Sequence, residues 1–147
     1  HNYVFLNSRE YYNIIQFLKE SKYEKANYTI ILSHCPPYSI SRHGSDYIIQ
    51  SMLNLSKIEF DIFLSGHEHC YMRFEISNKK YIINGLGGHS KYNFYNENKY
   101  LSKKLEKKYN QLESVFYLDF NSKYCYCYLK NINDQLIDSF KIRCKNI

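Results

Sequence analysis

Two short apolar segments, each followed at once by a polar loop with histidine, constrain the fold of this chain most. Residues 28–32 (YTIIL) lead into Ser33 and His34, and residues 60–64 (FDIFL) lead into the loop 65–69. Runs of this length, rich in β-branched and aromatic side chains, are typical of strands buried on both faces of a sheet. Because a helical pattern separates them, they predict an α/β core built in layers. Open sheets of this kind bind ligands at the carboxyl ends of their strands, where both histidine loops fall.

The rest of the chain adds helices and further strands to this core. Residues 77–80 (SNKK) separate two apolar runs and predict a β-hairpin. The predicted helices are 9–22, 46–55 and 101–112, and the other predicted strands are 3–6, 72–76, 81–84, 115–120, 124–129 and 136–142. No repeat, linker or internal boundary interrupts residues 1–147, so we expect a single domain.

Composition limits the classes of protein to which the chain can belong. Hydrophobic residues make up 44% and charged residues 23%, as in ordinary globular domains. No apolar run approaches the roughly 18 residues of a membrane span, so we expect no membrane segment. The net charge of +6 suits an anionic substrate but is too small to indicate nucleic acid as a partner. The five cysteines include no CxxC pair, which leaves a zinc-ribbon site unsupported.

Four of the six histidines lie in two short segments, as His34 and His43 in one and His67 and His69 in the other. A His-x-His pair in extended backbone directs both imidazoles to the same side, since side chains alternate along a strand. Imidazole is a common ligand of transition-metal ions such as zinc and iron. A third histidine after a neighbouring strand, His34, would complete a metal site at the same sheet edge. For the His-x-His pair taken alone, chance is the alternative, because exposed loops collect polar residues.

These segments resemble motifs of the calcineurin-like metallophosphoesterases. Residues 33–38 (SHCPPY) are similar to the GHxP segment, with serine in place of the usual glycine, and residues 66–69 (GHEH) match the GHxH motif. The stretch 38–44 (YSISRHG) further resembles the small, tartrate-resistant type of purple acid phosphatase. In that group a histidine nine residues after the metal ligand lies beside the substrate, and His43 has this spacing. Residues 84–88 (NGLGG) are similar to the family's glycine-rich segment after the last ligand.

The resemblance implies a layered α/β/β/α metallophosphatase sandwich and a phosphomonoesterase of the purple acid phosphatase type. It implies two metal ions, iron paired with iron, zinc or manganese, which activate a hydroxide that attacks the phosphate ester. His34 and His67 would bind the second metal and His69 the first. His43 would contact the phosphate and protonate the leaving group, a task that suits an ordinary histidine pKa of about 6.5. The plainer interpretation of His43 is a hydrated loop histidine.

Other residues near the motifs have plainer interpretations. Cys35 and Cys70 adjoin the predicted ligands, and we expect buried neutral thiols at both rather than metal thiolates. His89 follows the glycine-rich segment and matches no ligand of the family, so a surface role is expected. A group of lysines is expected to face solvent, opposite the apolar stripe of the helix predicted at 101–112: Lys99, Lys103, Lys104, Lys107 and Lys108.

Motifs for the remaining ligands of the resembled family do not occur in this sequence. The bridging aspartate and the Asp-x-His, Gly-Asp and Asn-His segments are missing from the thirty-three residues before His34. We therefore expect residues 1–147 to be the C-terminal part of one metallophosphoesterase domain, inactive without the missing N-terminal half. The alternatives are a phosphodiesterase or nucleotidase on the same fold, or a non-catalytic scaffold derived from it. A mononuclear metal site built from these histidines alone is a further hypothesis.

Overall fold

The helices and strands follow the predicted order closely. The computed structural model describes residues 8–21, 26–95 and 98–145, so the strand predicted at 3–6 lies outside the described residues. In chain order the elements are α1 (Ser8–Ser21), β1 (Ile30–Ser33), α2 (Tyr47–Ser56), β2 (Ile62–Ser65), β3 (Tyr71–Ile76), β4 (Lys79–Asn84), α3 (Lys99–Lys104), β5 (Leu105–Tyr109), β6 (Ser114–Phe120), β7 (Tyr124–Asn131) and β8 (Leu136–Arg143). Within the described ranges, no helix combines the length and the apolar character that crossing a bilayer requires.

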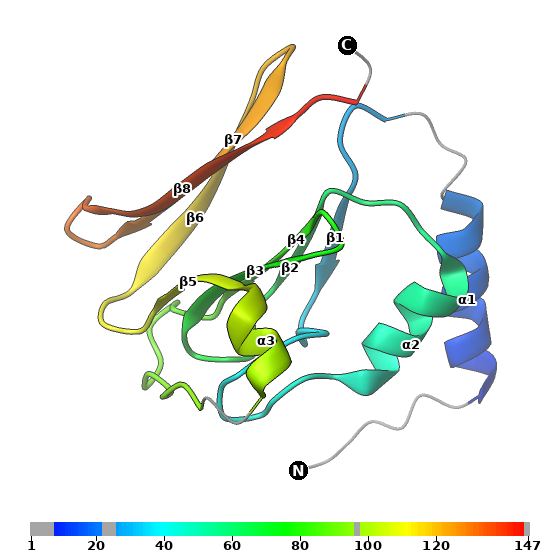
Figure 1. Cartoon of the computed structure of the whole chain (residues 1–147), viewed down its shortest axis with the longest axis horizontal. Coiled ribbons are helices and arrows are strands. Elements are labelled where there is room, and N and C mark those ends of the chain that lie inside the picture. Colours follow the sequence, from blue (N-terminus) through cyan, green and yellow to red (C-terminus); the bar gives the residue numbers. More distant parts are fainter. Residues whose placement is uncertain (1–7, 22–25, 96–97, 146–147) are drawn as a thin grey trace.

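Two sheets and a group of helices form three layers (Figure 1). The first sheet has the strand order β1-β2-β4-β3-β5, with β1, β2 and β4 parallel, and the second is the antiparallel sheet β6-β7-β8. Leu18, Leu53 and Leu101 pack from the three helices against one face of the first sheet. Ile82 and Leu129 belong to a second apolar cluster, between the two sheets. The α/β prediction is confirmed, and the described residues form the helix, sheet and sheet layers of the predicted sandwich without a second helical layer.

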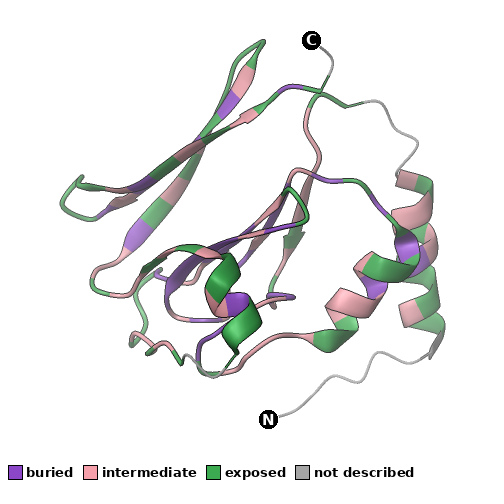
Figure 2. Ribbon diagram, in the orientation of Figure 1, coloured by how far each residue is buried: buried purple, intermediate pink, exposed green. Residues whose placement is uncertain are grey.

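The two strands that precede the histidine loops differ in burial. Ile62 and Phe63 of β2 are each 1% exposed and belong to the two different apolar clusters, so β2 is buried on both faces as predicted. Among the described strands β1 is the outermost of its sheet, and its Leu32 is 73% exposed. Figure 2 shows the same contrast, with buried residues concentrated on the central strands. The prediction of burial on both faces is therefore wrong for β1, because position in the sheet rather than composition decides it.

The helix predicted at 101–112 is wrong beyond Lys104. There α3 ends, and the chain continues as β5, which pairs antiparallel with β3. Alternate residues of β5 are partly buried and exposed, so the segment fits the period of a strand as well as that of a helix. The edge of β3 offers backbone hydrogen-bond partners along its length, whereas a short helix alone is marginal in water. The lysines expected on one helical face are accordingly divided between α3 and β5.

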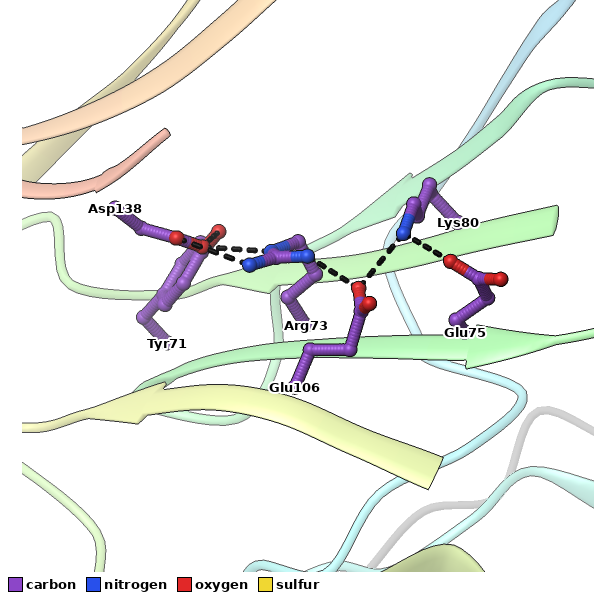
Figure 3. A network of polar contacts seen from close by, with 6 residues as sticks. All are labelled: Tyr71, Arg73, Glu75, Lys80, Glu106 and Asp138. Carbon is purple, nitrogen blue, oxygen red and sulfur yellow. Dashed lines mark hydrogen bonds and ion pairs between the residues drawn. The ribbon is translucent and has the colours of Figure 1, made fainter. Parts of the chain in front are cut away.

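A chain of ion pairs ties the two sheets together (Figure 3). Arg73 of β3 donates from Nε to Oδ2 of Asp138 on β8 at 2.7 Å, and from Nη2 to Oδ1 at 3.0 Å. Tyr71 donates its hydroxyl hydrogen to the same Oδ2 at 2.7 Å. Arg73 also contacts Glu106 of β5, which in turn pairs with Lys80 of β4. Every charge in this network thereby has a partner, as burial requires.

Parallel pairing brings the ends of three strands to one level at one sheet edge. Ser33 at the end of β1 pairs with Ser65 at the end of β2, and Ser65 pairs with Ile83 of β4. The loops that follow these strands therefore begin side by side. This register places His34 next to the 66–69 loop, although His34 and Gly66 are 32 positions apart in the sequence.

Candidate metal centre

The loop between β2 and β3 is bent rather than extended. His67 has a φ of +63°, in the left-handed region that non-glycine residues rarely adopt. A hydrogen bond from Glu68 N to Gly66 O, 2.7 Å long, closes the turn. The expectation of an extended backbone for the His-x-His pair is therefore wrong, although both histidines line the same cleft. The ring of His67 lies against His34, whereas the ring of His69 lies against a different set of side chains.

His34 and His67 present ring nitrogens to each other. Nδ1 of His67 lies 3.2 Å from Nε2 of His34, and the backbone N–H of Gly66 donates to the carbonyl oxygen of His34 at 3.1 Å. Two imidazoles bound to one tetrahedral zinc ion, with bonds of about 2.0–2.1 Å, hold their nitrogens about 3.4 Å apart. The observed pair has nearly this separation. Its spacing and its nitrogen donors fit two ligands of one transition-metal ion.

Cys35 is a third potential ligand beside this pair. Its Sγ and the ring nitrogens of His34 and His67 all lie within 4.8 Å of one another. Burial, followed by the negative charges of Asp46 and Glu68, raises the pKa of the Cys35 thiol. We therefore expect Cys35 to be mainly a neutral thiol, as predicted. Its side chain is only partly buried, whereas full burial was predicted. Cys70 is fully buried, and burial raises the pKa of its thiol to about 12.

His43 packs against His67 from the loop that follows β1. Their ring centroids are 4.4 Å apart, and the ring of His43 also meets that of Tyr92 at 5.4 Å. Burial, followed by the proximity of His43 and His34, lowers the pKa of His67. His67 is therefore neutral at pH 7, and neutral imidazole is the form that binds metal ions.

His69 is held with one ring nitrogen available to a ligand. Its Nδ1 lies 2.9 Å from the carbonyl oxygen of Ser90. Because a carbonyl only accepts hydrogen bonds, Nδ1 carries the proton and Nε2 keeps its lone pair. Tyr92 stacks on the ring at 4.1 Å and donates its backbone N–H to the carbonyl oxygen of His69 at 2.9 Å. On the other side, the ring of His89 lies 4.4 Å from that of His69.

One cleft of about 340 Å³ contains all three predicted metal ligands. It is lined by His34, His67, His69, Asn84, Gly85, Gly87 and His89. A glycine is required at position 85, because a Cβ there would lie 2.1 Å from the carbonyl oxygen of Glu68. The glycine-rich segment 84–88 therefore packs directly on the histidine loop. His89 is exposed, as expected for a surface residue, yet it forms part of the cleft wall.

Sequence reasoning missed two residues at this site, Glu68 and Tyr92. Glu68 is fully buried, and its carboxylate accepts hydrogen bonds from the loop that follows β1. Tyr92 lies between the rings of His43 and His69, with the guanidinium carbon of Arg42 5.1 Å from its ring centre. The position of Glu68 between two histidines does not indicate that it is buried. Tyr92 is one of 17 tyrosines, and no sequence pattern distinguishes it from the others.

Comparison with known proteins relates the first half of the chain to one family. The family model of the calcineurin-like phosphoesterases matches residues 2–71, a range that includes both histidine loops. The fold is metallophosphatase-like. The match supports the metallophosphoesterase superfamily, whose members bind divalent metal ions and phosphate-ester substrates. No curated protein sequence matches the chain.

Solved structures resemble this chain to different degrees. GAP50, the anchor in the inner membrane complex of Plasmodium, matches with a TM-score of 0.70 at 15% identity, over 94% of this chain and 43% of GAP50. Two Vps29 structures from Entamoeba histolytica, a single mutant and the wild type with Zn²⁺, have TM-scores of 0.45 at 17% and 16% identity, over 82% of this chain and 57% of each. At 15% identity the GAP50 match shows the fold alone. The chain spans less than half the length of GAP50.

Proposed function

We propose that this protein hydrolyses phosphate monoesters at a two-metal centre of the purple acid phosphatase type. The observation that supports the proposal is the arrangement of three histidines from two loops. Nδ1 of His67 lies 3.2 Å from Nε2 of His34, and the ring of His43 lies 4.4 Å from that of His67. Two nitrogen ligands and a third imidazole beside them are what a metal-bound phosphate ester and its leaving group would need.

In this proposal His34 and His67 hold one ion and His69 the other. The ions, iron paired with iron, zinc or manganese, would supply positive charge to bind phosphate oxygens and to lower the pKa of a bound water. The contact with the Ser90 carbonyl favours the neutral tautomer of His69 in which Nε2 is free to bind a metal ion, and it fixes the orientation of the ring. Among the described residues, no carboxylate joins the group of His34, Cys35 and His67. We therefore propose that a bridging carboxylate and the remaining ligands come from an N-terminal half of the domain.

His43 is placed to hold a proton for the leaving group. Its ring stands against His67, the proposed metal ligand, and is flanked by the ring of Tyr92. Arg42, next in sequence, adds a positive charge to the same loop, 5.1 Å from the Tyr92 ring centre. Because phosphoryl transfer depends mainly on positioning and electrostatics, the proposed contribution of these side chains is to orient the proton donor and to supply positive charge.

Replacing His43 by alanine should lower kcat by about 100-fold on an alkyl phosphate, the range of general acid catalysis. The loss should be much smaller on a nitrophenyl phosphate, because that leaving group departs without a proton. The assay requires the complete domain, with metal content measured on the same samples. An equal loss of kcat on both substrates would show that His43 is not the proton donor. Loss of bound metal in H43A would show that His43 is a metal ligand instead.

A non-catalytic scaffold is the second candidate function, because GAP50, which has this fold, is described as an anchor. The histidine arrangement favours the enzyme, since a scaffold needs neither a metal pair nor a flanking His43. Metal-dependent release of phosphate from a monoester supports the proposal. Bound metal without turnover of any phosphate ester supports the scaffold, and a faster rate on a phosphodiester than on the monoester would move the substrate class to diesters.

A further inference from the structure

Glu68 lies between two of the proposed ligands, yet its side chain turns away from them into the protein. It is 0% exposed. Oε1 accepts hydrogen bonds from the hydroxyl of Ser39 and from the backbone N–H groups of His43 and Gly44, each 2.9 Å long. All three donors belong to the loop that follows β1, so this carboxylate joins the two histidine loops.

The backbone of Glu68 is itself held firmly. Its N–H donates to the carbonyl oxygen of Gly66 at 2.7 Å, and its own carbonyl accepts from Cys70 N at 2.7 Å. The backbone of Gly85 packs so closely that a Cβ there would lie 2.1 Å from the Glu68 carbonyl oxygen. Glu68 is therefore a fixed point from which the loop carrying His43 is held in place.

A buried carboxylate of this kind is costly to the fold. Oε2 has no hydrogen-bond partner among the described residues, and no lysine or arginine of that part of the chain forms an ion pair with Glu68. Backbone amides and one hydroxyl supply its stabilisation, and hydrogen bonds to a charged acceptor are stronger than those between neutral groups. What these bonds provide is a defined position for the backbone of His43, whose ring lies against His67.

We propose that Glu68 is a positioning residue that fixes His43 at the candidate active site by binding the backbone amides of His43 and Gly44. The role of the His43 imidazole in catalysis rests on the proposed function. The hydrogen bonds by which Glu68 holds the backbone of His43 and Gly44 do not depend on that function. Glu68 touches neither ion nor substrate in this proposal. It acts only through the loop, which sets the distance from His43 to the proposed ligand His67.

A double-mutant cycle tests the functional half of the proposal. In the complete domain, E68Q should lower kcat on an alkyl phosphate by about tenfold to a hundredfold with normal metal content, because small misplacements of a reacting group are costly. In the H43A background, the same E68Q change should alter kcat by less than about twofold, since Glu68 acts through His43. Equal effects of E68Q in both backgrounds would overturn the proposal. E59Q, which alters a glutamate of an exposed ion pair with Lys79, is the matched control and should leave kcat unchanged.

Amide hydrogen exchange tests the hydrogen bonds from His43 and Gly44 to Glu68 and needs no enzymatic activity. In the wild-type protein, the amides of His43 and Gly44 should be protected although they lie in a loop, and E68Q should accelerate their exchange by at least about tenfold. E59Q should leave both rates unchanged. Fast exchange at both amides in the wild type would overturn the proposal, even if E68Q failed to fold. Protection that E68Q abolishes, in a protein with no phosphatase activity, would retain the positioning role and reject the proposed function alone.

Discussion

Replacing His67 by alanine should weaken binding of Zn²⁺ by at least about 100-fold, because the change removes one of the two facing nitrogens of the proposed metal site. The affinity is measured by calorimetric titration of the metal-free protein. Stability should change little, since histidine and alanine are both disfavoured at the positive φ of this position. H34A should have an effect of the same size, because Nε2 of His34 is the other half of the pair.

Two histidines of the same neighbourhood serve as controls for H67A. His89 lines the cleft without belonging to the group formed by His34, Cys35 and His67, and His43 packs against His67 from outside that group. Zinc affinity should therefore be retained in H89A and in H43A. If H67A bound zinc as tightly as the wild type, while H89A did not, the metal site would lie on the other side of the cleft and our assignment would be wrong.

Replacing Asp138 by asparagine should lower the free energy of unfolding by about 3 kcal/mol, the lower end of the range for breaking a buried ion pair from one side. Asp138 and Arg73 are each 9% exposed, and the two hydrogen bonds between them join the two sheets. We expect a loss of stability at the lower end of that range because Arg73 retains Glu106 as an ion-pair partner. Urea denaturation measures the change. D134N is the matched control, since Asp134 pairs with Lys130 at the surface and should contribute nothing measurable. Equal effects of D138N and D134N would contradict the account of the network.

The same carboxylate gives a pH dependence with a definite sign. Burial alone would raise the pKa of Asp138, but hydrogen bonds from Arg73 and Tyr71 outweigh it, and the pKa is lowered. A lowered pKa in the folded state contributes stability that is present above the ordinary aspartate value of 3.8 and lost as pH falls through the lower folded value. The wild-type protein should lose this contribution below about pH 4, whereas D138N, which has no carboxylate there, should lack that part of the acid dependence.

Much of the fold followed from local patterns in the sequence. The strand before His67 was predictable because Ile62 and Phe63 are both apolar in a short run between polar segments, and both are buried. The hairpin at 77–80 was predictable from its polar turn, which Ser77 and Asn78 form at φ values of 52° and 61°. The helix predicted at 101–112 failed because its alternating pattern satisfies two periods. Only the open edge of β3, which no local pattern reveals, decides in favour of β5.

The candidate site was predictable in its residues but only partly in its geometry. The register of Ser33 with Ser65 follows from parallel pairing, so the approach of His34 to the second loop could be anticipated. The bend at His67 could not, because a histidine at positive φ has no sequence signature. The buried position of Glu68 depends on contacts with Ser39 and His43, which are far from it in sequence. Side chains that act through such distant contacts escape motif-based reasoning.

The central claim is that His34 and His67 are two ligands of one metal ion. The most direct test is a Zn²⁺ titration of protein labelled with ¹⁵N in its imidazoles, followed by NMR of the ring nitrogens. Nε2 of His34 and Nδ1 of His67 face each other at 3.2 Å. We expect the resonances of these two nitrogens to shift together and to saturate at the same ratio of zinc to protein. Unchanged resonances of these two nitrogens in zinc excess, or a shift at His89 alone, would contradict it.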